Sequence, residues 1–212
     1  MKKINWADQL LNFLGIIVGV SLAFWINSLA QSSQEKKELQ QTVGSFISEL
    51  DFDIAVYEKN SIPDNKRQLL IIDSMIMLVK SGKIQSLDGF KAAFRYNNYY
   101  PQCVTFNSIS NSGKLDLIKD FEVRKQIIVY HEIVASEAQW KGNNQVEFNK
   151  SYIQSMFINE FDFLNPDVSQ INVVKMQNLL FLYRVLLSEK VRQYEFVVKN
   201  ARELRESLSE LQ

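Results

Sequence analysis

Residues 10–30 read LLNFLGIIVGVSLAFWINSLA, a run of 21 residues that contains no charged side chain. As an α-helix this run is about 31 Å long, at about 1.5 Å per residue, and the hydrocarbon core of a bilayer is about 30 Å thick. Trp6 and Trp25 lie about 28 Å apart along such a helix, so they suit the two membrane interfaces, where tryptophan is enriched. The run therefore predicts one transmembrane helix over residues 10–30.

Two other interpretations of this run stay open. In a cleaved signal peptide, Lys2-Lys3 would be the basic start and Ser28-Leu29-Ala30 the cleavage site, although the apolar run exceeds the usual length of about 7–15 residues. In a soluble protein, the run would be a buried core helix, but so long an uncharged stretch beside a polar remainder is unusual there. We favour the membrane span.

The flanking charges do not decide the orientation, because Lys2 and Lys3 precede the span and Lys36 and Lys37 follow it. A short head before a long polar domain favours an N-terminus in the cytoplasm. We expect residues 1–9 to form a short cytoplasmic head and residues 31–212 to form an extramembrane helical domain.

Small residues form a stripe along the predicted span. Gly15, Gly19, Ala23 and Asn27 are each four residues apart, so they share one face of a helix. Small residues allow two membrane helices to approach closely, and an asparagine at membrane depth adds about 0.6–2 kcal/mol by hydrogen bonding. We interpret the stripe as a site of membrane-helix association; the alternative is that glycine is simply frequent in membrane helices.

The composition excludes several classes of function. Lys plus Arg and Asp plus Glu both number 24, so the uniform basic field of a general nucleic-acid binder is missing. The single cysteine, Cys103, excludes an internal disulfide and a cysteine-based zinc site, and the single histidine, His131, excludes a multi-histidine metal centre. Seven glycines and three prolines in 212 residues favour long helices.

The polar remainder reads as a series of helices. No breaker separates residue 31 from the predicted span, so we expect one continuous helix that ends near Ile62–Pro63, because the residue before a proline disfavours helix. Gly82 and Gly142 are expected helix ends, and Thr105 and Asp120 are expected caps. These signals predict several shorter helices between residues 64 and 161.

The last helix is expected to be the longest, over residues 169–211. Apolar residues repeat every seven positions along it, which is the seam of a coiled coil: Leu180, Leu187, Tyr194, Ala201 and Leu208. A helix of this length spans about 60 Å and needs a long partner, either the helix that leaves the membrane or a copy of itself. The predicted fold is all-α: an N-terminal transmembrane helix continuous with an extramembrane helical bundle, closed by a long C-terminal helix with heptad character.

Two blocks of the sequence carry a resemblance to a known family. The anchor, which ends in the step Ile26-Asn27 before a charged helix, and the block Thr105-Phe106, Ser112-Gly113-Lys114-Leu115 and Leu117-Ile118 have the order seen in a bacterial domain-of-unknown-function family. The chain departs from that pattern at Ser28-Leu29 and at His131. The resemblance implies a small single-pass membrane protein of bacteria, and it implies no reaction. With the orientation favoured above, we expect the span in the bacterial inner membrane and the C-terminal domain in the periplasm.

No catalytic pattern stands out in the sequence. We interpret His131 as a hydrogen-bonded helix histidine and Cys103 as a buried small residue, because no nucleophile elbow or metalloprotease motif occurs. Glu49 and Asp53 share a helix face, and a solvated acidic face is a better interpretation than a metal-binding pair. We expect no enzyme activity, no cofactor and no bound metal.

The aromatic link before Cys103 has two interpretations. Tyr96, Tyr99 and Tyr100 flank Pro101, and such residues serve either as a contact surface or as a lid over a core. The function favoured by all these features is a non-enzymatic, membrane-anchored scaffold or interaction protein of the bacterial envelope, bound to the lipid bilayer and to itself or another membrane protein. The alternative is an extracytoplasmic sensor or ligand-binding helical module that acts with a partner chain.

Overall fold

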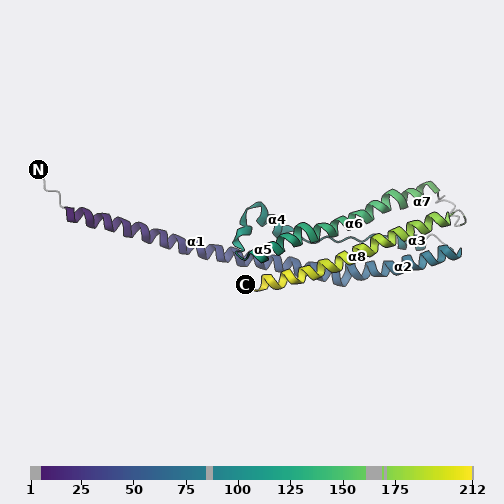
Figure 1. The fold of residues 1–212 in the computed structure, drawn as a ribbon, viewed down its shortest axis with the longest axis horizontal. Helices are drawn as coiled ribbons and strands as arrows, with labels where there is room; N and C mark the ends of the chain where they lie inside the picture. Colours follow the sequence, from purple (N-terminus) through teal and green to yellow (C-terminus); the bar gives the residue numbers. More distant parts are fainter. Residues whose placement is uncertain (1–5, 85–87, 161–168, 170, 212) are drawn as a thin grey trace.

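The computed structural model describes residues 6–84, 88–160, 169 and 171–211, with side chains from Phe13 onward. Within these residues the chain is helical apart from turns and short connections, and no strand occurs, which confirms the predicted all-α fold. Figure 1 shows a long helix whose N-terminal part protrudes from a bundle of three helical rods.

The first rod is one unbroken helix, made of α1 (Trp6–Val56), the π-helical turn η1 (Tyr57–Ser61) and α2 (Ile62–Ser81). The predicted end near Ile62–Pro63 is therefore wrong. Pro63 has no N–H, and in an α-helix its ring clashes with the carbonyl four residues earlier. In the wider turn η1 the N–H of Ile62 bonds to the carbonyl of Tyr57, five residues back, so the helix passes the proline. The rod ends at Gly82, as predicted, with a left-handed φ of 67°.

The second rod follows the same direction as α2 in Figure 1 and contains two further π-helical turns. Its parts are α5 (Phe121–Ile128), η3 (Val129–Ala135), α6 (Ser136–Phe148), η4 (Asn149–Gln154) and α7 (Ser155–Glu160). Asp120 caps it as predicted, since its carboxylate accepts from the N–H groups of Glu122 and Val123. The predicted helix end at Gly142 is wrong, because α6 continues through it.

The third rod is α8 (Val173–Ser209), which runs back toward the anchor. It is shorter than the predicted residues 169–211, because the side chain of Asn172 caps its N-terminus by accepting from the N–H of Lys175. The heptad positions from Leu180 to Leu208 form a buried face of this helix, as predicted, and a coiled coil stays a prediction. α8 packs against α1, α2 and α6 of the same chain.

Short elements join the first rod to the second: α3 (Asp88–Ala93), α4 (Val104–Asn111) and the 3-10 turn η2 (Lys114–Leu117). Thr105 does not cap α4, contrary to prediction; it lies inside the helix. The Glu49 carboxylate of α1 accepts from its N–H at 2.9 Å and from its hydroxyl at 2.6 Å instead. The sequence also suggests Ser86 or Asp88 as a helix start and Asn165–Pro166 as a turn; α3 begins at Asp88, and Ser86 and Asn165–Pro166 lie outside the described residues.

Two hydrophobic clusters fill the bundle, with a polar layer between them. Phe46 and Tyr130 belong to the cluster nearer the anchor, and Phe90 and Met176 belong to the other. Between the clusters each rod turns polar side chains inward: Asn65 and Gln68 from the first rod, Gln145 and Asn149 from the second, and Lys190 from the third. Packed helices satisfy their own backbone hydrogen bonds and need no polar side chains between them. The polar layer therefore indicates that a non-helical segment lies between the rods.

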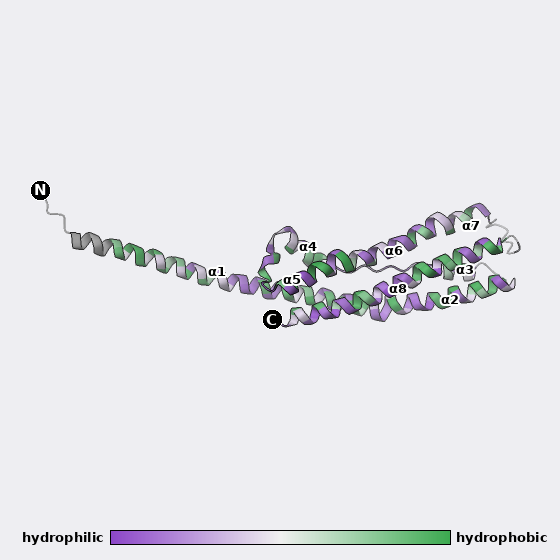
Figure 2. Ribbon diagram, viewed as in Figure 1, coloured by the Kyte–Doolittle hydropathy of each residue, from purple (hydrophilic) through white to green (hydrophobic). Residues whose placement is uncertain are grey.

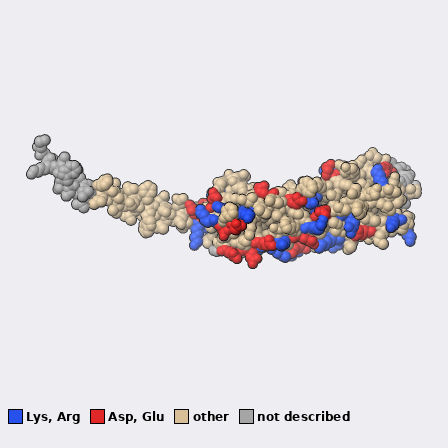
Figure 3. All heavy atoms as spheres, viewed as in Figure 1, with Lys and Arg blue, Asp and Glu red and all other residues tan. Residues whose placement is uncertain are grey.

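The protruding part of α1 is apolar and uncovered. The helix is long and apolar enough to cross a membrane, and none of the side chains in its apolar window is buried in the chain. Figure 2 shows much of this part in hydrophobic colours, and among the residues coloured by charge in Figure 3 the charged side chains begin where the bundle begins. The predicted anchor is thus an exposed helix and not a core helix of the described domain.

Candidate functional site

The polar layer surrounds a segment that is not helical. Residues 94–103, called the strap below, connect α3 to α4 and lack regular secondary structure. In Figure 1 the strap runs as a thin line along the bundle between α6 and α8. A backbone placed between helices finds no neighbouring strand, and unbonded buried N–H and C=O groups are costly. Side chains of the rods must therefore bond it.

Carbonyl groups at the start of the strap are bound by amide and hydroxyl groups. Asn149 of η4 donates to the carbonyl of Phe94 at 2.6 Å. Tyr183 of α8 donates to the carbonyl of Arg95 at 2.8 Å, and Gln68 of α2 donates to the same carbonyl. All three rods thus hold this end of the strap.

Lys190 holds the middle of the strap and is fully buried. Its Nζ donates to the carbonyl of Asn97 at 3.1 Å and to Oδ1 of Asn98 at 3.0 Å, and also to Oε1 of Gln145. These bonds use the three N–H donors of the ammonium group. Burial lowers the pKa of Lys190 to about 7. The lysine therefore joins the strap to the second and third rods through neutral acceptors.

Asp53 of α1 holds the other end of the strap. Its carboxylate accepts from the hydroxyl of Tyr99 at 2.7 Å and from the N–H of Gln102 at 3.0 Å. Burial raises the pKa of Asp53 to about 6. The expected solvated acidic face is therefore wrong for Asp53, because the strap covers it.

Both carboxylates of the Glu49–Asp53 pair accept hydrogen bonds, whereas Oε2 of Glu49 is buried without a hydrogen-bond partner among the described residues. Oε1 of Glu49 accepts from both polar hydrogens of Thr105, and Asp53 bonds the strap. Within the described residues no group of three histidine, cysteine or acidic side chains lies close enough to hold a metal ion.

Three tyrosines lock the strap to the first and third rods. The hydroxyl of Tyr57 in η1 donates to the carbonyl of Tyr99, and the N–H of Tyr99 donates to the hydroxyl of Tyr194, both at 3.2 Å. The ring of Tyr57 packs edge-on against Tyr99 at 5.1 Å and against Tyr194 at 4.7 Å between centroids. Such contacts combine ring packing with a polar bond to the strap.

Gly142 gives the strap room to pass α6. A Cβ added at this glycine would lie 3.0 Å from Cε1 of Tyr100 and 3.2 Å from Cγ of Asn98. The carbonyl of Gly142 also accepts from Nδ2 of Asn98 at 3.0 Å. Gly142, which suggested a helix end in the sequence, therefore allows the strap to lie close to α6.

The predicted contact residues divide between the two sides of the strap. Tyr99 faces the bundle, whereas Tyr96 and Tyr100 keep 44% and 37% of their surface exposed. The hydroxyl of Tyr100 donates to Oδ1 of Asn143 at 2.9 Å. A contact surface at Tyr96 and Tyr100 stays a prediction.

His131 lies in the cluster nearer the anchor and is 5% exposed. Its ring stacks on Phe106 at 4.6 Å, and neither ring nitrogen has a hydrogen-bond partner among the described residues. The expected hydrogen-bonded histidine is therefore wrong. Burial lowers the pKa of His131 to about 4. The neutral ring behaves as an aromatic core residue.

Cys103 ends the strap and is half-buried rather than buried as expected. Burial, together with the charges of Asp53, Glu49 and Glu132, raises the pKa of its thiol. A thiol of raised pKa is a weak nucleophile, because the thiolate is the reactive form.

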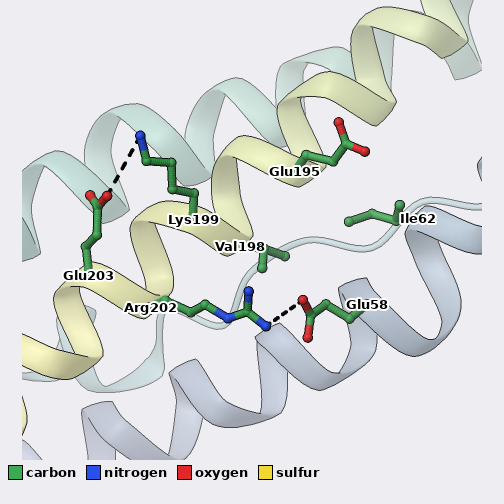
Figure 4. Close-up of a pocket in the computed structure, with 7 residues that line it drawn as sticks. All are labelled: Glu58, Ile62, Glu195, Val198, Lys199, Arg202 and Glu203. Atoms are coloured by element: carbon green, nitrogen blue, oxygen red, sulfur yellow. Dashed lines mark hydrogen bonds and ion pairs between the residues drawn. The ribbon is translucent and has the colours of Figure 1, made fainter.

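A surface groove of about 580 Å³ lies between η1 and α8. Figure 4 shows its lining, with Ile62 and Val198 among charged residues. Glu58 pairs with Arg202 at 2.7 Å, and Lys199 pairs with Glu203 at 3.9 Å. These charges are already neutralised within the chain, so the groove offers little to a charged ligand.

The predicted association residues lie on the protruding helix. Gly15, Gly19, Ala23 and Asn27 are exposed, as is Trp25, and a Cβ added at either glycine meets no atom within 4 Å. Trp6 begins α1, but its side chain lies outside the described residues. The stripe is thus free for another helix, and its role stays a prediction.

Comparisons of the chain with protein-family models, with curated proteins and with solved structures found no match. The family resemblance seen in the anchor and in residues 101–131 therefore stays a prediction. The strap site rests on geometry alone.

The sequence did not reveal the residues that bind the strap. The available signal was a set of amides at inward positions of otherwise apolar helix faces, at Asn65, Gln68, Gln145 and Asn149. Buried amides need partners, but nothing in the pattern says that the partner is a distant connecting segment.

Asp53 and His131 are expected to give opposite pH dependences of stability. The pKa of Asp53 is raised from 3.8 to about 6, so its contribution is present below about pH 4 and is lost as the pH rises through 6. The pKa of His131 is lowered from 6.5 to about 4, so its contribution is present above 6.5 and is lost as the pH falls through 4. In the native chain the two largely cancel.

We therefore expect Asp53→Asn to give a free energy of unfolding that rises between pH 4 and 6.5, and His131→Phe to give one that falls. Each change amounts to about 3 kcal/mol. Urea unfolding of the two variants at several pH values checks this. Parallel pH profiles of both variants would show that the burial of these groups is wrong.

Gly142→Ala is expected to destabilise the protein by about 1 kcal/mol, because the added methyl group pushes against Tyr100 and Asn98. Gly44→Ala is the matched control, since a Cβ there meets no atom within 4 Å; it should stabilise α1 by about 0.5–1 kcal/mol. Urea unfolding measures both changes. Equal stabilisation by the two alanines would contradict a close approach of the strap.

Proposed function

We propose that the chain is a non-enzymatic scaffold or interaction protein of the bacterial cell envelope. In this proposal residues 10–30 cross the inner membrane once, the short head is cytoplasmic, and the helical domain stands in the periplasm. The observation that carries the proposal is the single unbroken helix that leaves the bundle as an uncovered apolar rod.

The exposed surface of this rod supports a membrane location. Phe24, Trp25 and Ile26 keep 73%, 63% and 61% of their surface exposed. A continuous apolar surface of this kind is uncommon on soluble monomers and marks a membrane or protein contact. A lipid bilayer covers such a surface without any specific partner.

The length of the continuous first rod determines how far the helical domain extends from the bilayer. Counted from residue 31 to Ser81 at about 1.5 Å per residue, the helix extends about 75 Å. A rigid rod of this length carries the far end of the bundle well away from the bilayer surface. That geometry suits a protein that contacts other envelope proteins rather than lipid alone.

The side of α1 that faces away from the bundle supports self-association. Ser48 follows Gly19 by about eight helical turns, so both point to the same side of the helix, whereas Phe46 and Leu50 point into the core. Gly44, which is half-buried, and Ser48, which is exposed, are small residues on this side of the bundle, with Lys37 on the same side between them and the anchor. A second copy can approach along this side without meeting the other rods.

The residues available for chemistry support a non-enzymatic role. His131 is buried as a neutral aromatic ring, and the raised pKa of the Cys103 thiol disfavours the thiolate. The second candidate function, a ligand-binding module that acts with a partner chain, is favoured by one observation: the polar layer holds a segment between the rods, as helix bundles hold ligands.

Crosslinking in native membranes tests the proposed self-association. In a Cys103→Ser background, Ser48→Cys should form an intermolecular disulfide under oxidation, because the two outer sides of α1 face each other. Gly19→Leu should reduce this crosslink, since the larger side chain separates the anchors. Ser21→Leu, on the other side of the anchor, should leave it unchanged.

Fractionation of the same cells tests the anchor. The chain should stay with the membrane after alkaline carbonate washing, with residues 1–30 still present in the intact mass. Recovery of the full-length chain in the soluble fraction would overturn the proposal, and an unchanged crosslink in Gly19→Leu would remove its self-association part.

A further inference from the structure

We propose that the end of the helical domain next to the span is a lipid-binding surface, on which lysines bind the phosphate groups of anionic phospholipids and Phe121 enters the headgroup layer. This surface, called the base below, consists of residues 35–38 of α1 and residues 111–125, from the end of α4 into α5. The inference rests on the membrane anchor proposed above and adds a second contact with the same bilayer.

The base is fixed to the helix that leaves the membrane. Nζ of Lys114 in η2 pairs with Oε2 of Glu38 in α1 at 2.9 Å. Leu115 of η2 and Leu39 of α1 both pack against the hydrophobic cluster nearer the anchor, and Ile118 is a buried member of that cluster. The connection between α4 and α5 is therefore held at the height of Glu38 along the first rod.

The unbroken helix α1 places the base beside the bilayer. Glu38 follows Ala30, the last residue of the apolar run, by eight positions, which is about 12 Å along a helix. The headgroup layer takes up about 5–7 Å of this distance, and lysine side chains on long stems extend toward it from such positions. In Figure 1 the connection between α4 and α5 lies at the end of the bundle nearest the protruding part of α1. A bilayer around residues 10–30 is thus the surface closest to the base.

The charges of the base leave lysines available for phosphate groups. Six basic and five acidic side chains nearly balance there, and Figure 3 shows both signs at this end of the bundle. Lys36, Lys37 and Lys119 are exposed, and none of them forms an ion pair among the described residues. The acidic side chains all accept bonds from neighbouring groups: Glu35 from Gln31, Glu38 from Lys114, Asp116 from Arg124, Asp120 from the start of α5, and Glu122 from Lys125. The unpaired lysines are complementary to anionic headgroups, which attract basic residues close to a membrane surface.

Phe121 gives the base an exposed aromatic ring. It begins α5 and keeps 65% of its surface exposed, whereas Val123 of the same helix is buried. The cap at Asp120 fixes this first turn, since its carboxylate accepts from the N–H of Glu122 at 2.8 Å. Phenylalanine beside lysine is typical of helical segments that lie in the membrane interface. Phe121 and Lys119 therefore suit the headgroup layer together.

The composition of the base favours lipid over a protein partner. A stable protein interface buries about 1,200–2,000 Å² and has an apolar centre. The base offers one large exposed ring among scattered charges. Lipid headgroups are mobile and bind scattered lysines without a matching shape, so a bilayer fits this surface better.

Fluorescence quenching in vesicles tests the proposal with the full-length chain. In a Cys103→Ser background, Ser112→Cys carries a bimane label on the base, and Ser81→Cys carries the same label at the far end of α2. The vesicles contain phosphatidylcholine with or without phosphatidylglycerol, and some lipids carry a nitroxide on the headgroup. We expect severalfold stronger quenching at residue 112 than at residue 81, and an increase at residue 112 when phosphatidylglycerol is present. Equal quenching at the two positions would overturn the proposal.

Charge variants separate lipid binding from mere closeness to the bilayer. Lys119→Glu should abolish most of the increase that phosphatidylglycerol causes at residue 112, because the new carboxylate repels anionic headgroups. Lys83→Glu is the matched control at an exposed lysine just beyond α2, and it should leave the increase unchanged. Quenching that does not depend on phosphatidylglycerol, or that is the same in both variants, would overturn the proposal. Crosslinking of residue 112 to another protein in native membranes, without quenching in vesicles, would assign the base to a protein partner and would also overturn it.

Flotation of the same vesicles reports on the anchor separately. A chain that does not float with the vesicles would overturn the anchor and, with it, the lipid-binding base. A chain that floats while its label at residue 112 stays unquenched would overturn the lipid-binding base alone.

Discussion

The rest of the bundle depends on the hydrogen-bonding needs of one extended segment. The strap passes between helices, so its N–H and C=O groups must be bonded by side chains. This requirement explains why polar residues occupy interior positions on all three rods and why they separate two hydrophobic clusters. Two π-helical turns also supply binding groups, since Tyr57 lies in η1 and Asn149 begins η4. Such turns redirect side chains within a helix and are frequent at functional positions.

The sequence was sufficient for features that depend on local chemistry or on helical period. The uncharged run, the seam of α8, the end of the first rod at Gly82 and the cap at Asp120 follow from rules that involve only near neighbours. The errors share a different cause. Pro63 and Gly142 are usual signs of a helix end, but one is passed by a π-helical turn and the other provides room for the strap. Periodicity indicates which face of a helix is buried and not what covers it. The aromatic link before Cys103 was expected as a contact surface or a lid, but its course between the rods and the residues that bind it were not predicted.

The anchor and part of the polar layer belong to the same continuous helix, the first rod. Residues of the span are uncovered, whereas Asp53, Tyr57 and Asn65 on the same continuous helix bond the strap. The proposed association through the outer side of α1 and the binding of the strap therefore use different sides of one helix.

Hydrogen exchange of individual strap amides in the full-length chain tests most directly whether the bundle holds a buried backbone. We predict that the N–H groups of Tyr99 and Gln102, which donate to Tyr194 and Asp53, exchange as slowly as the amides in the middle of α8. Exchange of both amides at the rate of an exposed coil would contradict the account, because the polar layer would then have nothing to hold.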